Sequence, residues 1–307
     1  NILQGGAGTD TLSGGDGIDV INGYYIGETE SSIEYDTVSY EYLTSKAVTV
    51  NLETGIAYVD ANDNDTLISI ENLIGGSLND VITGSSVVNI LQGAAGDDTF
   101  VSSLGDDFIY GGTIIADSHT TGDMVDYSNS INSNNKLFID LGAVTSGYSE
   151  AFVTLISNNS KAYTDRLFGI ENITGTQNND TLYGNALNNT LVGADGNDTL
   201  KGGLGADRLV GGEGNDLFLI EDADITDAGG DIIIGGNGND TLSYIGITGT
   251  TGVTVNLETG ADVTIGSYSH SFSGIEHLIG TNQKDTLTGD TNLNKVQGMG
   301  GDDTILG

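Results

Sequence analysis

Residues 5–22 read GGAGTDTLS and then GGDGIDVIN, two consecutive nine-residue units built on one pattern. Glycine stands at positions 1, 2 and 4, Asp at position 6 and a large apolar residue at position 8. Because glycine adopts positive φ readily, the first four positions predict a tight turn. The last three predict a very short strand with only its middle side chain pointing inward. Repetition of the unit therefore predicts a parallel solenoid with two units in each coil.

The same unit returns along the whole chain. Clear copies begin at residues 93, 193, 202, 211, 235 and 298, and weaker copies at 75, 84, 102, 175, 184, 280 and 289. Units 18 residues apart are expected to stack on the same side, which brings the carboxylates of Asp180, Asp198 and Asp216 together. Such carboxylates repel one another unless a hard cation lies between them. Carboxylate and carbonyl oxygens are the ligands that calcium prefers.

The repeated GGxGxDxUx pattern resembles the RTX repeat, the hemolysin-type calcium-binding nonapeptide of large bacterial proteins exported by type I secretion. The resemblance implies an all-β fold, a parallel β-roll or β-helix solenoid, with several Ca²⁺ ions between stacked turns. It implies carboxylate ligands from position 6: Asp10, Asp19, Asp80, Asp98, Asp107, Asp180, Asp198, Asp207, Asp216, Asp240, Asp285 and Asp303. It implies carbonyl ligands from the turns: Gly6, Gly8, Gly15, Gly17, Gly96, Gly105, Gly196, Gly203, Gly205, Gly212, Gly214, Gly236 and Gly238.

Six units depart from the pattern, two after each long insert. All six lack glycine at position 4, where they carry Leu78, Val87, Asn178, Leu187, Gln283 and Asn292. The second unit of each pair also has Asn in place of Asp at position 6: Asn89, Asn189 and Asn294. We expect these turns to bind calcium weakly or not at all.

Longer segments separate the repeat blocks of what we expect to be one continuous solenoid over residues 1–307. The expected repeat blocks are 1–23, 75–112, 175–243 and 280–307, with a smaller loop at 220–234. The expected β inserts are 24–74, 113–174 and 244–279. The inserts form either wider coils of the solenoid or small β-domains, and the acidic loop 220–234 is either an extra calcium loop or a solvated one.

Composition excludes several classes of protein. The chain has 48 Gly among 307 residues, no Pro, Cys or Trp, and a net charge of −36. This charge repels phosphates, so we expect no nucleic-acid partner. No apolar run is long enough for a membrane span. The absence of Cys excludes disulfides and thiolate metal sites.

No catalytic constellation is visible, and we expect the chain not to be an enzyme. His119 and His270 are interpreted as inert loop residues, and His277 as a surface variant of the Asn found in the other copies. Glu71, Glu171 and Glu276 recur outside the repeat turn. We interpret them as acceptors for backbone N–H groups at the coil junctions, with a calcium-ligand role as the alternative.

The expected function is that of a calcium-binding structural or adhesive segment, which folds on Ca²⁺ binding after export. Its parent would be a secreted bacterial surface protein such as an adhesin, a surface-layer protein or a fibre component. The alternatives are the carboxy-terminal folding and export module of a secreted enzyme or toxin, and a glycan-binding module. The glycan alternative rests on the many Tyr residues of the first insert, for which core filling is the simpler interpretation. Further candidate partners are a second copy of the chain, end to end or side by side, and surface glycans. The chain starts and stops within units, so we expect it to be an internal piece of a longer protein.

Overall fold

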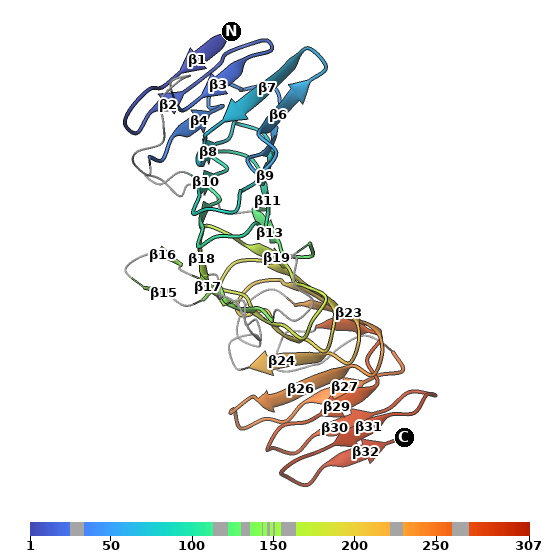
Figure 1. Ribbon diagram of the computed structural model, residues 1–307. Helices are drawn as coiled ribbons and strands as arrows, with labels where there is room; N and C mark the ends of the chain where they lie inside the picture. Colours follow the sequence, from blue (N-terminus) through green and yellow to red (C-terminus); the bar gives the residue numbers. More distant parts are fainter. Residues whose placement is uncertain are drawn as a thin grey trace. The chain divides into compact units, whose positions relative to one another are not determined.

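The computed structural model describes residues 1–24, 34–112, 122–129, 136–142, 144–145, 148–149, 151–154, 164–221, 230–259 and 270–307. All regular elements in these ranges are β-strands (Figure 1), which confirms the predicted all-β class. None of the described segments forms a helix long and apolar enough to cross a membrane. The chain divides into two compact units. One is Asn1–Ser130 with Val144–Val153 and Tyr163–Ile170, and the other is Ile131–Ala143 with Thr154–Ala162 and Glu171–Gly307.

The first unit contains two main sheets. One has the strand order β1 (Ile2–Gln4), β3 (Val20–Asn22), β7 (Asp63–Ile68), β6 (Ile56–Asp60), β5 (Thr49–Asn51), β9 (Val81–Thr83), β11 (Thr99–Val101) and β13 (Met124–Asp126). The other has the order β2 (Thr11–Leu12), β4 (Thr37–Ser39), β8 (Asn72–Ile74), β10 (Ile90–Gln92), β12 (Phe108–Tyr110), β18 (Thr164–Phe168) and β17 (Ala151–Thr154). Strands β15 (Val144–Thr145) and β16 (Tyr148–Ser149) form a separate antiparallel pair.

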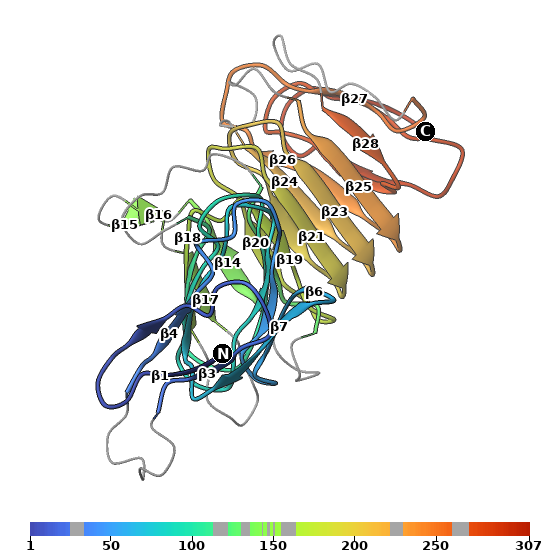
Figure 2. The ribbon, with the colours of Figure 1, turned by 90° about the horizontal axis from the view of Figure 1, so that it is seen from above.

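The second unit contains three sheets. The first has the order β19 (Asn172–Thr174), β21 (Thr190–Asp195), β23 (Arg208–Glu213), β25 (Ile232–Asn237) and β28 (Ser271–Ser273). The second has the order β14 (Phe138–Asp140), β20 (Thr181–Tyr183), β22 (Thr199–Lys201), β24 (Leu217–Glu221), β26 (Thr241–Gly246), β29 (His277–Ile279) and β31 (Lys295–Gln297). The third has β27 (Thr254–Asn256), β30 (Thr286–Thr288) and β32 (Thr304–Leu306). Figure 2 shows β21, β23 and β25 side by side.

The strands stack with the 18-residue step that the repeat predicts. In β21 and β23, Thr190 pairs with Arg208 in parallel, and in β20 and β22, Thr181 pairs with Thr199. The middle residue points inward in most short strands, and these side chains form the core, whereas Ile305 of β32 is exposed. The completely buried ones in the second unit include Leu182, Leu191, Leu200, Leu209, Phe218 and Leu242. Each of these coils thus contributes apolar side chains to the core from both sides.

The first insert contains both coil-forming and antiparallel strands. Strand β4 lies between β2 and β8 in parallel register, so it continues the coil. Strands β5, β6 and β7 instead form an antiparallel meander, with Thr49 paired to Tyr58 and Ile56 paired to Thr66. The predicted strand at Val48, Val50 and Leu52 is present, and all three side chains are buried. Strand β5 then pairs with β9 in parallel and rejoins the next repeat block.

Candidate calcium-binding turns

The position-6 side chains form a hydrogen-bonded ladder from coil to coil. The backbone N–H of Asp180 donates to Oδ1 of Asp198 (2.7 Å), and that of Asp198 donates to Oδ1 of Asp216 (2.8 Å). The N–H of Asp216 donates in the same way to Oδ1 of Asp240 (2.8 Å). One carboxylate oxygen of each of these residues is therefore satisfied by protein alone. This contact gives position 6 a structural reason for Asp that is separate from any metal.

Acidic residues outside the nine-residue units, in the inserts and in the loop 220–234, continue the same ladder, and the repeat pattern does not predict them. In each case the Oδ1 atom accepts from the backbone N–H of a position-6 Asp. The pairs, acceptor first, are Asp36 and Asp10, Asp65 and Asp19, Asp123 and Asp98, Asp165 and Asp107, and Asp231 and Asp207. The acceptors lack the glycine signature, and the only sequence signal is an Asp directly before or within a β-rich segment.

Two of the recurrent glutamates end a stretch of ladder, as predicted. Oε2 of Glu71 accepts from the N–H of Asp36 (2.9 Å), and Oε2 of Glu276 accepts from the N–H of Asp240 (2.8 Å). Their interpretation as acceptors for backbone N–H groups is confirmed. Glu171 is buried.

The interpretation of His270 as an inert loop residue is wrong. Its side chain is only 1% exposed, and its Nδ1 accepts from the N–H of Asp231 (3.1 Å), in the place that a carboxylate fills elsewhere. His277 accepts from the N–H of Lys295 (3.1 Å), just as Asn172 accepts from Thr190. His277 therefore makes the same side-chain hydrogen bond as the Asn of the other copies. His119 lies outside the described residues, as do Asp222, Asp224 and Asp227 of the acidic loop.

The second carboxylate oxygen separates the turns into two kinds. In the first kind, which we call open turns, Oδ2 is buried and has no hydrogen-bond partner. These carboxylates belong to Asp10, Asp19, Asp98, Asp198, Asp216 and Asp240. In the second kind, which we call closed turns, the backbone N–H of position 2 donates to the position-6 side chain. Their donors are Gly76, Ser85, Thr176, Asn185, Thr281 and Asp290, and their acceptors are Asp80, Asn89, Asp180, Asn189, Asp285 and Asn294.

The closed turns are the six units that depart from the repeat pattern. Their backbone differs as well, because open turns have positive φ at positions 2 and 4, as at Gly212 (116°) and Gly214 (130°). Even the non-glycine residues at position 2 of regular units, Ala94 (78°) and Ala194 (81°), adopt this conformation. A turn that lacks glycine at position 4 therefore closes on its own side chain. The turn of Asp107 is intermediate, because its Oδ2 accepts from the Ser103 hydroxyl (2.9 Å).

The predicted ligand residues are brought together as pairs across stacked turns. Asp80 and Asp98, Asp285 and Asp303, and Asp207 and Asp231 are each linked by one amide-to-carboxylate bond. In the described part of the chain, no group of three or more His, Asp or Glu side chains is arranged to hold a metal ion. A cation in these turns would need backbone carbonyl oxygens for its remaining ligands, which is the mixed oxygen set typical of calcium.

The electrostatics of the open turns favour a bound cation. Burial raises the pKa of Asp198 to about 8, and the charges of Asp180 and Asp216 add to the rise. Burial likewise raises the pKa of Asp98 to about 8 and that of Asp240 to about 6. A buried carboxylate oxygen without a donor is costly. A bound cation would neutralise the buried negative charge and give the Oδ2 atom a partner, so the residues present fit calcium.

These shifts predict the pH dependence of the metal-free protein. Between the unfolded pKa of about 4 and the folded value of about 8, the native state holds protons that the unfolded state has lost. The free energy of unfolding in chelator should therefore fall as the pH rises from about 4 to 8. Calcium should reverse this trend and release protons on binding. Far-UV circular dichroism across this pH range, with and without Ca²⁺, measures the folded fraction and therefore both effects. A chelated chain that gains β-structure as the pH rises would contradict the assignment.

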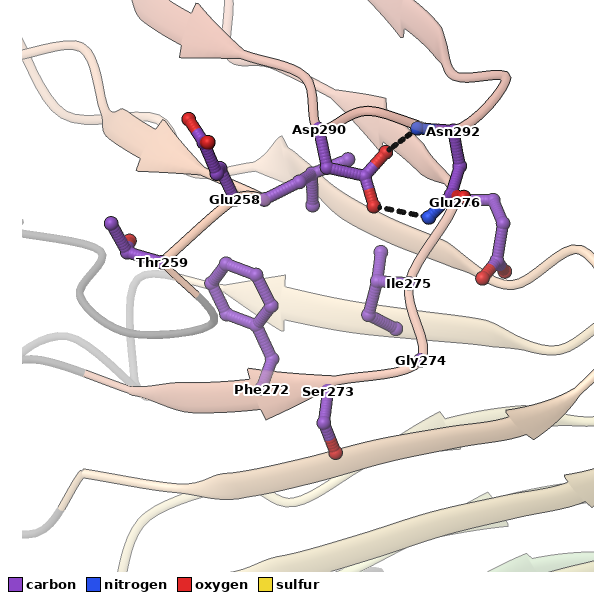
Figure 3. A pocket seen from close by; sticks show the side chains of 10 residues that line it. Glu258, Thr259, Phe272, Ser273, Gly274, Ile275, Glu276, Asp290 and Asn292 are labelled. Carbon is purple, nitrogen blue, oxygen red and sulfur yellow. Dashed lines mark hydrogen bonds between the residues drawn. The ribbon is translucent and has the colours of Figure 1, made fainter.

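A cavity of about 310 Å³ lies beside the closed turn of Asp290 in the second unit (Figure 3). Phe272 and Ile275 contribute apolar side chains to its lining, and Glu258, Glu276 and Asp290 contribute carboxylates. Both the backbone N–H and the side-chain amide of Asn292 donate to the Asp290 carboxylate. The Asp290 carboxylate in this lining is thus held by local hydrogen bonds.

The fold and the turns define a calcium-type β-roll, and comparison with known families agrees. The model of the RTX calcium-binding nonapeptide repeat matches residues 1–24, 83–113, 167–186, 183–218, 225–243 and 279–307, slightly more than half of the chain. The chain belongs to this family of RTX calcium-binding repeat proteins.

Other comparisons add little to the family assignment. Among solved structures, the chain is similar to the extracellular lipase LipA from Serratia marcescens, with 22% identity and a TM-score of 0.23. The likeness covers 66% of this chain and only 37% of the lipase, so it carries no argument about activity. No curated protein matches the sequence.

Proposed function

We propose that this chain is a calcium-dependent structural segment of a secreted bacterial protein, such as an adhesin, a surface-layer protein or a fibre component. The observation that carries the proposal is the row of open turns, each with a buried carboxylate oxygen that has no donor. These turns recur at the coil spacing in a chain of net charge −36. A coil built this way is opposed by its own charges until cations bind.

The proposed mechanism couples folding to the calcium concentration. At an assumed Kd of ~10⁻⁴ M, the tight end for extracellular modules, ~1 mM Ca²⁺ stabilises the native state by about 1.4 kcal/mol per site. In the cytosol, where free Ca²⁺ lies far below this Kd, the stabilisation vanishes. The chain would then pass an export channel unfolded and fold outside the cell. The family's association with type I secretion supports this order of events.

Far-UV circular dichroism during a Ca²⁺ titration tests the proposal. We expect a transition from coil to β-structure at sub-millimolar to millimolar Ca²⁺, reversed by chelator. Mg²⁺ at the same concentrations should not produce it, because Mg²⁺ demands a compact octahedral site and gives up its water reluctantly. A chain that is fully β in excess chelator would overturn the mechanism.

A further inference from the structure

One repeat turn of the first unit, residues 14–19, is covered by a strand rather than by another glycine turn. Strand β7 pairs in parallel with β3, with Val20 opposite Thr66 and Ile21 opposite Leu67 (Figure 1). Asp65 fills the ladder position, because its Oδ1 accepts from the N–H of Asp19 (3.0 Å). If the same register is extended by three residues towards the N-terminal side of both segments, Asp63 lies opposite Gly17 of the turn.

Asp63 has a buried carboxylate without a partner. The residue is only 3% exposed, and neither of its carboxylate oxygens has a hydrogen-bond partner. The burial pattern of β7 places Asp63, Asp65 and Leu67 on the same inner face of the strand. Because an isolated buried carboxylate is costly, the fold needs something positive beside Asp63.

The turn itself offers further oxygen atoms. Oδ2 of Asp19 is buried without a partner, and the hydroxyl of Tyr42 donates to the carbonyl of Gly15 (2.8 Å). Burial raises the pKa of Tyr42, and the charges of Asp63, Asp65, Asp16 and Asp19 raise it further. Asp63 therefore lies near enough to act electrostatically on a hydroxyl that contacts the turn.

We propose that Asp63 of strand β7 is a further divalent-cation ligand at the open turn 14–19, where its carboxylate replaces the carbonyls of a neighbouring glycine turn. Asp19 and carbonyls of the turn would complete an oxygen-only set suited to Ca²⁺. The proposal rests on calcium binding by the open turns and adds a ligand from the first insert to one of them. The positions two residues before Asp123, Asp165 and His270 of the other inserts hold Thr121, Tyr163 and Tyr268, none of them acidic, so we assign this ligand to the first insert.

The test compares Asp63→Asn with Asp60→Asn in the full chain. Asp60 is a matched control, because it lies on the same hairpin but is exposed and paired with Lys46 (2.7 Å). Bound calcium per chain, measured by equilibrium dialysis and metal analysis, should fall by one ion in Asp63→Asn and stay unchanged in Asp60→Asn. Terbium luminescence sensitised by Tyr40 and Tyr42 should fall in Asp63→Asn alone.

The outcomes separate this site from the open turns. If Asp63→Asn binds as many ions as the natural chain while Asp198→Asn binds fewer, only the Asp63 site is overturned. If the natural chain binds no calcium, the proposed function itself fails. In saturating Ca²⁺, Asp63→Asn should still fold, because the other open turns keep their ions and a buried unpaired charge is removed. Loss of folding in saturating Ca²⁺ would show a purely structural role and overturn the site.

Discussion

Gly214→Ala is expected to destabilise the calcium-loaded protein by about 3 kcal/mol or more. A Cβ at Gly214 would run into the carbonyl oxygen of Gly196 in the stacked turn, and the residue has φ of +130°. Backbone cannot move aside as a flexible side chain can, so the coil spacing itself must open. Guanidinium unfolding in saturating Ca²⁺, followed by circular dichroism, measures the loss.

Gly8→Ala provides the matched control, because Gly8 stands at the same position of its unit as Gly214. Gly8 also has positive φ (115°), but a Cβ there would meet nothing within 4 Å. Only the conformational cost remains, about 1–2 kcal/mol. Equal losses for the two variants would show that turn stacking is not what excludes a side chain at position 4.

Asn189→Leu should destabilise the protein by about 3 kcal/mol at every Ca²⁺ concentration at which the natural chain folds. Asn189 is buried in a closed turn, where it accepts from the N–H of Asn185 (2.8 Å) and donates to the carbonyl of Glu171 (2.8 Å). The apolar side chain removes both of these hydrogen bonds. Bound calcium per chain should not change, because the turn is satisfied by protein alone.

Asp198→Leu is the open-turn counterpart, and its effect should depend on calcium. At the lowest Ca²⁺ concentration that folds the chain, it removes a buried carboxylate whose Oδ2 has no donor, which offsets the hydrogen bond lost from Asp180. In saturating Ca²⁺ the missing ligand costs more, so the loss of stability should be several-fold larger and the ion count lower. Parallel melts of the two variants at these two Ca²⁺ concentrations measure this contrast. The same calcium dependence for both would refute the division into open and closed turns.

The structure of the regular nine-residue units could be predicted from the sequence, because the residue type at each position has a single structural role: glycine in the turn, Asp in the ladder and an apolar residue in the core. The 18-residue register, the inward residue of each strand and the six aberrant turns all follow from that pattern. The ladder roles of Asp65, Asp165 and His270 could not be predicted, because no glycine turn precedes them. The meander of β5, β6 and β7 was also missed, since alternation predicts a strand but not its pairing partner. Two expectations remain predictions: that residues 1–307 form one continuous solenoid, and that its twelve position-6 Asp residues bind calcium.

The ladder also gives the coil a direction. Each rung's N–H is satisfied by the coil that follows it in sequence, as Asp180 is by Asp198 and Asp198 by Asp216. A partly folded roll therefore exposes an unpaired N–H donor at its C-terminal face and an unpaired Oδ1 acceptor at its N-terminal face. We expect new coils to add to the two ends of a growing roll at different rates. The folding rate should therefore depend on which end of the chain leaves the export channel first.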